Sequence, residues 1–491
     1  MLIIKKKYLE FIIIIFSGIL YTFSFAPIDF KIGIFISLIL FLYILSISTK
    51  KASMFKSFLY GIAVFSSGVS WIFNSIYHYG GEDIFISTII TFFFILLLSI
   101  FFIPLGYFFN KENDMHRSYM PIIVASMWVI LEFIRSNIFT GFPWLLVGTS
   151  QTGTFFDSLY PIFGTYIVSF FVVMISMMVT VFILSKSKIF LSKIYFLFIL
   201  ILFMLINLFP IYTTDSQKSI KMTIIQPNIH LGIKFNESEL NSIKRKYLQI
   251  LDNKIHDLIV LPETAIPKIY QLDKTFYEKL RMNKNINIIT GVFNYSHDND
   301  EIYNSILILN DSETFYNKRH LVPFGEYTPF ERVFGIIGKV LNIPMSNLAP
   351  GDFNQKDTKY ENVTLHTLIC YEIAYPYLIK TNDDYGMIIN VSNDAWFGDS
   401  FAPHQHLQIA QTRALESSRP IIRAANTGIS AVIDKNGNIV NQIQLNDEGY
   451  INAEIYPSRG ITPYMYFGDY PLLMLIFSIM LLYWKYNKKY G

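Results

Sequence analysis

The stretch V-T-L-H-T-L-I-C-Y-E-I-A-Y-P, residues 363–376, indicates how the second half of this 491-residue chain folds. Its first part, 363–370, is rich in β-branched and aliphatic side chains, which predicts a buried strand. The strand ends at Cys370, the only cysteine of the chain. A single cysteine excludes an internal disulfide and any multi-cysteine metal site. Cys370 is therefore either a small buried side chain or a nucleophile, and a nucleophile needs partners that favour its thiolate.

The composition indicates a membrane protein. Hydrophobic residues make up 52% of the chain, and the mean hydropathy is +0.38, which is too apolar for an ordinary soluble protein. The net charge of only +3 argues against a nucleic-acid partner. The length allows two or more domains.

The apolar residues gather in stretches close to the ~20 residues that a helix needs to cross a bilayer. Seven lie in the first half and one near the end: 8–26, 31–48, 57–77, 84–108, 119–138, 161–185, 192–210 and 471–486. Eight such stretches argue against core helices of a soluble protein. We expect a polytopic α-helical membrane protein with about eight transmembrane helices. Its predicted parts are a seven-helix membrane region at 1–212, a soluble domain at 218–457, and the eighth helix with its tail at 468–491.

Basic residues predict the orientation of these helices. Lys5, Lys6 and Lys7 precede the first stretch, and Lys and Arg recur in alternate connecting segments, which by the positive-inside rule places the N-terminus in the cytoplasm. Seven crossings then put the soluble domain outside the cytoplasm, and the eighth returns the C-terminus to the cytoplasm. No small-residue cleavage site follows the first stretch, so we interpret it as a helix rather than a signal peptide.

The soluble domain has the pattern of a layered α/β or α+β fold. Short β-type runs occur at 222–228, 257–263, 286–293, 303–309, 363–370, 387–393 and 428–434, and helical spacing occurs at 237–253 and 404–418. Apolar residues at 330, 333, 334, 337 and 341 also follow helical spacing. That segment is either a helix packed on the core or an amphipathic lid that touches the bilayer.

Three reactive residues lie at strand ends, where a rigid sheet can position them. They are Glu263, Lys318 and Cys370. Glu263 could act as general base for the thiol, while the Lys318 charge favours the thiolate and stabilises an oxyanion. Taken singly, each has a plainer interpretation: a solvated carboxylate, an exposed basic cluster and a buried thiol. His404 and His406 lack a clear third ligand, so we expect no metal.

Eight motifs occur in one order along the chain. They are F-A-P (25–27), L-E-F-I-R with F-T-G-F-P-W-L (131–145), I-I-Q-P-N (224–228), L-P-E-T-A-I-P (261–267), K-R-H-L-V-P-F-G-E-Y (318–327), I-C-Y-E (369–372), N-V-S-N-D-A-W-F-G-D-S (390–400) and R-A-A-N-T-G-I-S-A-V-I-D (423–434). Together, over nearly the whole chain, they resemble the apolipoprotein N-acyltransferase family of the nitrilase superfamily.

The resemblance implies an extracytoplasmic α-β-β-α sandwich with Glu263, Lys318 and Cys370 as catalytic triad. It gives supporting roles to Glu326, Tyr371 and Glu372, and it suggests that Asn294, Trp396 and Phe235 line the substrate site. Phe235 stands where the family often has Trp. We expect this difference to affect the preference for the acyl donor more than the acyl-transfer reaction itself.

The implied reaction has two steps. Cys370 takes a fatty acyl chain from a phospholipid as a thioester, and the chain then passes to the α-amine of the N-terminal diacylglyceryl-cysteine of an apolipoprotein. No cofactor is expected, because the thiol supplies the covalent chemistry. The expected protein is a monomer in the bacterial inner membrane, with its catalytic domain on the periplasmic side and both termini cytoplasmic.

Two other functions stay open. A membrane-tethered nitrilase-type amidase would use the same triad, but eight helices exceed what anchoring requires. Glu132 and Arg135, three residues apart in an apolar stretch, suggest either a role within the membrane or a simple salt bridge. A non-enzymatic receptor or assembly factor predicts loss of a triad member, and all three are present.

Overall fold

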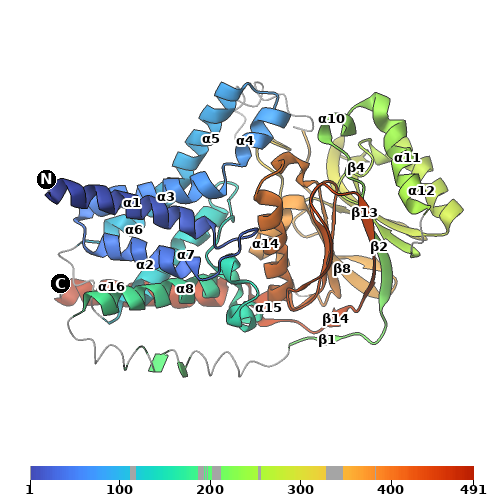
Figure 1. Cartoon of the computed structure of the whole chain (residues 1–491). Coiled ribbons are helices and arrows are strands. Elements are labelled where there is room, and N and C mark those ends of the chain that lie inside the picture. Colours follow the sequence, from blue (N-terminus) through green and yellow to red (C-terminus); the bar gives the residue numbers. More distant parts are fainter. Residues whose placement is uncertain are drawn as a thin grey trace. The chain divides into compact units, whose positions relative to one another are not determined.

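Figure 1 shows the chain as a computed structural model. The structure describes residues 2–110, 118–185, 193, 195, 197, 198, 200, 201, 212–252, 256–327, 347–381 and 383–490. The segment at 330–341 and most of the stretch at 192–210 lie outside the described residues. The chain divides into two compact units, which we call the helical unit (Met1–Phe73, Phe85–Pro210 and Phe467–Gly491) and the sheet unit (Asn74–Ile84 and Ile211–Tyr466).

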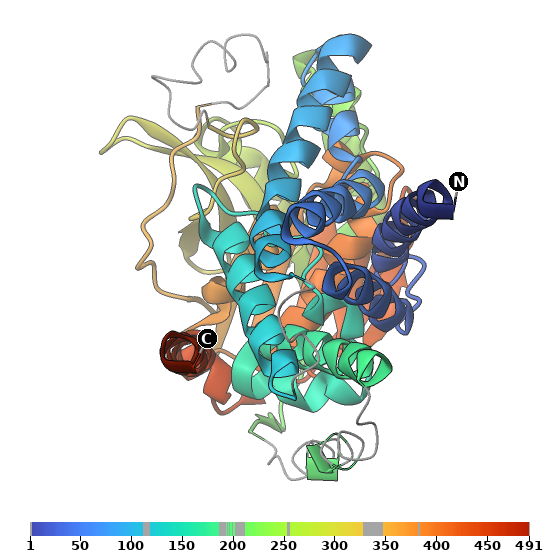
Figure 2. The same cartoon turned by 90° about the vertical axis from the view of Figure 1, so that its left-hand side faces the viewer.

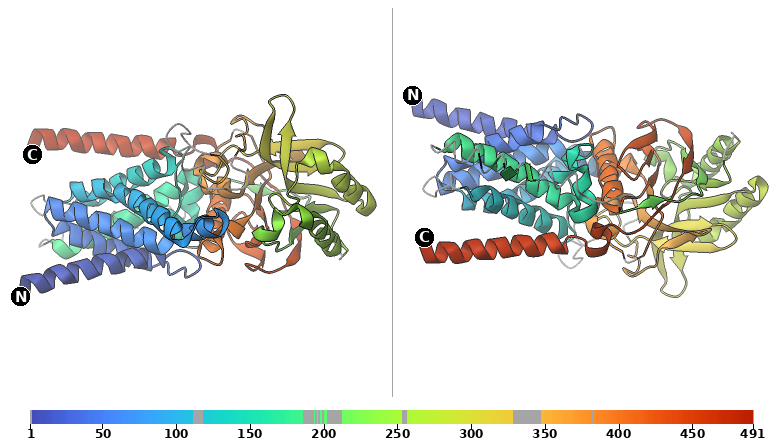
Figure 3. Two further views of the ribbon diagram at one scale, coloured as in Figure 1. Left: turned by 90° about the horizontal axis from the view of Figure 1, so that it is seen from above. Right: turned by 90° about the horizontal axis from the view of Figure 1, so that it is seen from below.

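Apolar helices, most of them long, build the helical unit, as Figures 2 and 3 show. They are α1 (Leu2–Thr22), α2 (Gly33–Ser46), α3 (Lys50–Gly68), α5 (Ile84–Ser99), α6 (Ile103–Phe108), α7 (Met120–Asn137), α8 (Tyr160–Leu184) and α16 (Tyr470–Tyr490). Within the described residues, three helical segments are long and apolar enough to cross a membrane: Ile84–Phe108, Met120–Asn137 and Phe155–Leu184. A fourth is obtained if α3 and Ile72–His78, which meet at a bend of 58°, form one span.

Small residues allow these helices to approach closely. A Cβ atom on Gly18 of α1 would lie 2.5 Å from Cβ of Ala63 in α3, and one on Gly106 of α6 would lie 2.5 Å from Oγ of Ser57. Contacts between small residues are typical of helices packed in lipid, where close backbone approach replaces the hydrophobic effect as a source of affinity.

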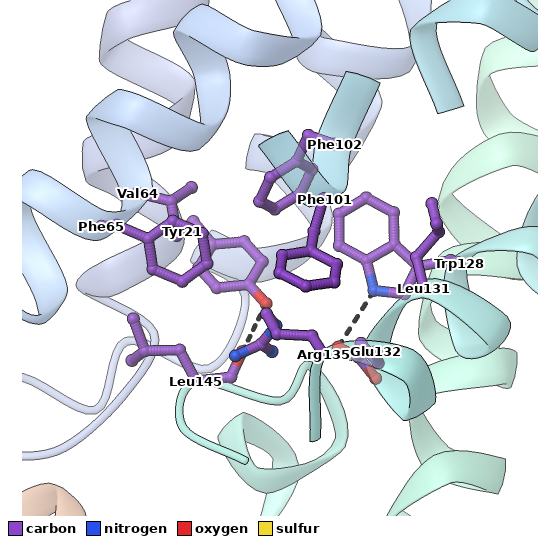
Figure 4. Close-up of a pocket in the computed structure, with 10 residues that line it drawn as sticks. All are labelled: Tyr21, Val64, Phe65, Phe101, Phe102, Trp128, Leu131, Glu132, Arg135 and Leu145. Carbon is purple, nitrogen blue, oxygen red and sulfur yellow. Dashed lines mark hydrogen bonds between the residues drawn. The ribbon is translucent and has the colours of Figure 1, made fainter. Parts of the chain in front are cut away.

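Glu132 and Arg135 line an aromatic pocket inside the helical unit (Figure 4). Glu132 Oε1 accepts hydrogen bonds from Trp128 Nε1 at 3.0 Å and from the Val147 amide at 2.8 Å. Arg135 Nη1 donates to the carbonyls of residues 142 and 144 at 2.8 and 2.7 Å. In the described part of the chain no ion pair joins the two side chains. Both charged groups instead hold the loop that follows α7, so the salt bridge considered from the sequence is not formed.

Two six-stranded mixed sheets form the centre of the sheet unit. The first has the order β13-β2-β3-β4-β5-β6, with bounds Gly449–Ile455, Ile220–Gln226, Leu258–Val260, Asn287–Ser296, Glu301–Leu309 and Glu313–Asn317. The second has the order β12-β11-β10-β9-β8-β7, with bounds Ile439–Ile443, Ser430–Ile433, Ile421–Ala425, Met387–Ser392, Val363–Ile369 and Thr358–Tyr360. Strands β2, β3 and β4 pair in parallel, as do β8, β9 and β10. Each parallel set directs its carboxyl ends to one edge of its sheet.

Helices cover the outer faces of the sheets, which gives the expected α-β-β-α layers (Figure 1). Helices α11 (Leu240–Leu251) and α12 (Tyr270–Lys284) lie on the first sheet, and α14 (Ala402–Ser417) lies on the second. In α11 the buried residues are Ile243, Tyr247, Ile250 and Leu251, a spacing that places one apolar stripe on the sheet. All six residues of β9 are buried, as expected for a parallel strand that is covered on both faces.

The sheet unit also includes a segment from far upstream, Asn74–Ile84. Its π-helical turn, Ser75–Tyr79, follows the short helix α4 (Ile72–Asn74). Asn74 Nδ2 donates to the carbonyl of Phe397 at 3.1 Å, and Ser75 Oγ donates to that of Trp396 at 2.8 Å. Gly398 next to them has φ of +60°. This upstream segment therefore holds the turn at 396–398.

The predicted strand at 257–263 is shorter in the structure. Strand β3 ends at Val260, and Glu263 lies in the loop beyond it. The strand expected before Lys318 is β6, although its bounds were not predicted. Other strands were missed altogether, namely β7, β10, β12, β13 and the two-residue strands β1 (Thr214–Asp215) and β14 (Ser458–Arg459).

Candidate active site

A close contact between backbones holds the loop that carries Glu263. The Gly291 amide of β4 donates to the Pro262 carbonyl at 3.1 Å, and the Ala265 amide donates back to the Gly291 carbonyl at 3.0 Å. A Cβ atom on Gly291 would lie 2.4 Å from Cα of Glu263. Only glycine leaves room for this approach, which explains a glycine inside a strand. Glu263 is 6% exposed.

Lys318 follows β6 and meets two carboxylates. Its Nζ lies 2.8 Å from Oε1 of Glu326 and 3.6 Å from Oε1 of Glu263. Asn304 of β5 completes the cluster, because its Nδ2 donates to Oε1 of Glu263 at 2.7 Å and to Oε1 of Glu326 at 2.9 Å. Lys318 is only 1% exposed. An ammonium and an amide thus hold both carboxylates in fixed positions.

Cys370 begins a 3-10 turn, Cys370–Ala374, directly after β8. Its φ is +50°, a left-handed conformation that costs a non-glycine residue about 1 kcal/mol or more. Contacts on both sides maintain it. Before the turn, Glu372 Oε2 accepts from the Ile369 amide at 2.8 Å. After it, His406 Nε2 lies 3.2 Å from the Cys370 carbonyl oxygen.

Glu372 connects the Cys370 turn to the Lys318 loop. Its Oε1 accepts hydrogen bonds from the amides of Arg319 at 2.7 Å and His320 at 3.1 Å, and its carboxylate also accepts from the Tyr316 hydroxyl. Glu372 is fully buried. One carboxylate therefore fixes the two loops that carry the thiol and the ammonium.

His406 belongs to a buried ionic network. Asp394 Oδ2 accepts from Arg423 Nη2 at 2.7 Å, and Asp394 Oδ1 lies 3.0 Å from His406 Nδ1. Burial and the Arg423 charge lower the pKa of His406, so the imidazole is neutral at pH 7. A carbonyl can only accept, so the proton of the neutral ring lies on Nε2 and is donated to Cys370.

The charges around the thiol act in opposite directions. Burial, reinforced by the negative charge of Glu263, raises the pKa of Cys370 to about 12, and Lys318 opposes this shift. Burial alone would lower the pKa of Lys318, but the charges of Glu326 and Glu263 outweigh it and raise that pKa. The site at neutral pH therefore holds a protonated thiol, a permanent cation and a carboxylate close to that cation.

The remaining predicted residues differ in their burial and in the contacts that they make. Tyr371, beside the thiol, is 8% exposed and stacks edge-to-face with Tyr375. Trp396 is half-buried, and its carbonyl accepts from Ser75. Asn294 exchanges amide hydrogen bonds with Gln271 and Asn317. Among the described residues no hydrogen bond or ring contact joins Asn294 or Phe235 to Glu263, Lys318 or Cys370.

Three buried residues of the site were missed from the sequence: Asn304, His406 and Lys234. Asn304 interrupts the apolar run at 303–309, and a polar residue inside a buried strand was the available signal. His406 was considered as a metal ligand and interpreted instead as a structural residue, without a link to the Cys370 turn. Lys234 ends the short helix α10 (Leu231–Lys234), and its Nζ donates to the Glu263 carbonyl at 2.9 Å. Nothing in the local pattern indicated that this lysine is buried.

Comparison with known proteins gives the class of the domain first. Residues 223–461 match the family model described as Carbon-nitrogen hydrolase, which makes the sheet unit a domain of that class. A solved CN-hydrolase superfamily protein from Xanthomonas campestris aligns with 49% of this chain and 91% of its own, with a TM-score of 0.38 and 16% identity.

The match to curated relatives is more specific and extends over both units. Residues 17–178 match the model described as Apolipoprotein N-acyltransferase N-terminal domain. The apolipoprotein N-acyltransferase of Pasteurella multocida is 32% identical over 97% of this chain and 95% of its own length. That of Coxiella burnetii is 32% identical over 96% of this chain and 99% of its own. The chain belongs to the apolipoprotein N-acyltransferase family.

Proposed function

We propose that this protein transfers a fatty acyl chain from a phospholipid to the α-amine of the N-terminal diacylglyceryl-cysteine of apolipoproteins. The observation that carries the proposal is the cluster of Glu263, Lys318 and Cys370 in a chain of this family. The charges of Glu263 and Lys318 both act on the Cys370 thiol, and a carboxylate, an ammonium and a thiol are groups that covalent acyl transfer can use.

The first half-reaction forms a thioester. Because the Cys370 thiol is protonated in the resting site, Glu263 takes its proton as Sγ attacks the ester carbonyl of the phospholipid. Lys318 and the Tyr371 amide stabilise the oxyanion that develops, a contribution of about 3 kcal/mol for each donor. The tetrahedral intermediate then collapses, the ester C–O bond breaks, and Glu263 returns the proton to the leaving lysophospholipid oxygen.

The second half-reaction forms an amide. The free α-amine of the apolipoprotein attacks the thioester carbonyl, and the same donors stabilise the oxyanion. Glu263 takes a proton from the attacking nitrogen, the C–S bond breaks, and the proton returns to the Cys370 thiolate. Thioesters react readily with amines, and a site closed to water limits hydrolysis of the acyl-enzyme.

The supporting residues take their proposed roles from their contacts. Glu326 balances the charge of Lys318, to which it is 2.8 Å distant. Glu372 holds the Cys370 turn against the Lys318 loop. For Asn294, Trp396 and Phe235, lining of the substrate site remains a proposal that rests on resemblance to the family.

The membrane arrangement is likewise proposed. Eight transmembrane helices, a periplasmic catalytic domain and cytoplasmic termini fit the charge pattern of the connecting segments. Both proposed substrates carry acyl chains, so an inner-membrane monomer would meet them in the lipid phase. We propose the parts 1–212, 218–457 and 468–491 for the membrane region, the catalytic domain and the last helix.

The test is intact-mass analysis of the purified protein after incubation with phospholipid. The expected result is a gain of one fatty acyl mass that hydroxylamine removes and that Cys370→Ser lacks. A diacylated lipopeptide should discharge the adduct, and the lipopeptide should gain the same mass. Absence of an adduct with every phospholipid tried would overturn the acyltransferase proposal in favour of a membrane-tethered amidase.

A further inference from the structure

Lys234 is a second lysine of the site that the mechanism above does not use. It is 1% exposed, and its ammonium donates to the main-chain carbonyl of Glu263 at 2.9 Å. Across the described residues it makes no other hydrogen bond and has no carboxylate within 4.0 Å. A buried ammonium without an ion pair is costly and rare, so its presence requires an explanation.

The environment of Lys234 is the opposite of that of Lys318. Burial lowers the pKa of Lys234 to about 8, although the negative charges of Glu263 and Cys370 attract its proton. Lys318 sits between two carboxylates and remains charged. The site therefore contains one permanent cation and one lysine whose charge changes close to physiological pH.

The coupling of Lys234 to Cys370 is reciprocal. If the thiolate of Cys370 favours the protonated form of Lys234, the protonated form of Lys234 favours the thiolate by the same free energy. The single hydrogen bond of Lys234 also fixes the carbonyl of Glu263. This bond adds to the contacts of Gly291, which hold the same loop from β4.

We propose that Lys234 is a positioning residue that fixes the main chain at Glu263 and supplies a second positive charge in favour of the Cys370 thiolate. The inference rests on the proposed role of Cys370 as nucleophile. It adds to the Glu–Lys–Cys cluster a group whose support depends on pH, because deprotonation of Lys234 removes the charge.

The dependence on pH involves every charged group that acts on the pair. Cys370 is affected by Glu263, Lys318 and Asp394, and Lys234 by Glu263 and Cys370. Lys318 remains protonated, and although burial opposes it, the charge of Arg423 keeps Asp394 ionised and lowers its pKa. Between pH 7 and 10 the group whose charge changes most beside the thiol is thus Lys234.

The experiment measures the rate at which iodoacetamide alkylates the purified full-length protein, from pH 6 to 10. With one cysteine in the chain, the gain in intact mass beyond that of a Cys370→Ser protein at the same pH reports Cys370 alone. We compare wild type, Lys234→Met and the control Lys279→Met, an exposed lysine of α12. We expect Lys234→Met to react about ten-fold more slowly at pH 7, as for a thiol pKa raised by roughly one unit, and the difference to shrink towards pH 10. Lys279→Met should match wild type.

The shape of this profile separates the proposal from a structural defect. A misplaced loop would lower the rate by one factor at every pH, and a constant ratio would overturn the proposal. If Lys234→Met does not fold, Lys234→Arg serves, because its charge persists to pH 10. The alkylation rate of Lys234→Arg relative to wild type should then rise between pH 7 and 10. A constant ratio would again overturn the proposal.

The wild type alone gives a further readout. Its logarithmic rate should rise with unit slope below pH 8 and less steeply just above it, as Lys234 loses its proton. Alkylation requires no lipid. A protein that forms no acyl adduct can therefore still show these profiles, and failure of the proposed function is distinguishable from failure of this inference.

Discussion

Lys318 Nζ lies 2.8 Å from Oε1 of Glu326. This is 0.8 Å less than the 3.6 Å that separates the same nitrogen from Oε1 of Glu263. The stronger ion pair is thus with the carboxylate that we do not assign as the base. Glu326 neutralises the cation, and Glu263 stays available for the proton of Cys370.

Glu326→Gln tests this division. The substitution keeps the shape of the side chain but leaves Lys318, within the part of the chain that the structure describes, with Glu263 as its one carboxylate partner. That ion pair should tighten, and Glu263 should become a weaker base. We expect acyl-enzyme formation to fall about 10- to 100-fold. The stability should fall too, by up to about 3–5 kcal/mol, because the change breaks a buried pair.

Acyl-adduct formation over time and the midpoint of thermal unfolding measure the two effects. Glu301→Gln, at the exposed start of β5, is the matched control. A Glu326→Gln protein that acylates at the wild-type rate would show that Lys318 does not need this partner.

Gly291→Ala should damage the site through the backbone. The added Cβ would lie 2.4 Å from Cα of Glu263 and 2.5 Å from the Thr264 nitrogen, so the Glu263 loop must shift. A displacement of about 1 Å can cost 10²-fold in rate, and we expect a loss of that order in acyl-adduct formation. Gly232→Ala is the control, because a Cβ there meets no atom within 4 Å. Equal rates of acyl-adduct formation in the two variants would mean that the position of the Glu263 loop does not affect the reaction.

The Cys370 thiol should make stability depend on alkaline pH. Burial raises its pKa to about 12, whereas an unfolded thiol titrates near ~8.5. Above pH ~8.5 the unfolded chain loses a proton that the folded chain keeps, so folding becomes less favourable by about 1.4 kcal/mol per pH unit. The contribution is complete below pH ~8.5 and is lost as pH rises towards 12.

Cys370→Ala lacks this contribution. We therefore expect the unfolding midpoint of wild type to fall relative to that of Cys370→Ala between pH 8 and 10, with a constant difference between pH 6 and 8. Thermal unfolding in detergent at each pH measures it. Parallel curves up to pH 10 would mean that the thiol titrates normally in the folded protein.

Asp394→Asn should unbalance the network behind Cys370. The change removes the carboxylate from the buried Arg423, at a cost of about 3–5 kcal/mol. Arg423 Nη2 also lies 3.0 Å from Nδ1 of His406, so a shift of Arg423 should disturb the imidazole whose Nε2 donates to the Cys370 carbonyl. We expect a lower unfolding midpoint and slower acylation. Asp298→Asn, in an exposed turn, is the control. If Asp394→Asn loses stability but acylates normally, the network supports the fold without aligning the thiol.

The sequence identified those parts of the site that depend on local order. Glu263 and Cys370 each follow an apolar run and Lys318 follows a short strand, and residues placed just after the strands of a rigid sheet are candidates for a site. Asn304, His406 and Lys234 could not be assigned in this way, because their roles depend on contacts between residues 29 to 41 positions apart. Their side chains are ordinary in sequence and become functional only through burial.

In the fold, too, features set by local sequence were predicted and features set by long-range contacts were not. Most strands of the buried parallel core, such as β4 and β9, were predicted because apolar side chains dominate them, but β10, a five-residue strand that contains Arg423, was missed. The edge strands β7 and β12 were missed: β7 has three residues and β12 is largely exposed, so neither carries an apolar run. The order of strands in each sheet is set by pairing over long distances, which no local pattern encodes.

The upstream segment Asn74–Ile84 has a consequence for how the protein is made. Its donors at residues 74 and 75 reach acceptors that follow 323 and 321 positions later. At about 5–20 residues synthesised per second, the segment waits roughly 16–65 s for its partners. A fragment that contains only residues 211–466 would therefore lack the donors at Asn74 and Ser75. In the whole chain, the turn at 396–398 is held by a segment that lies, in sequence, between helices of the helical unit.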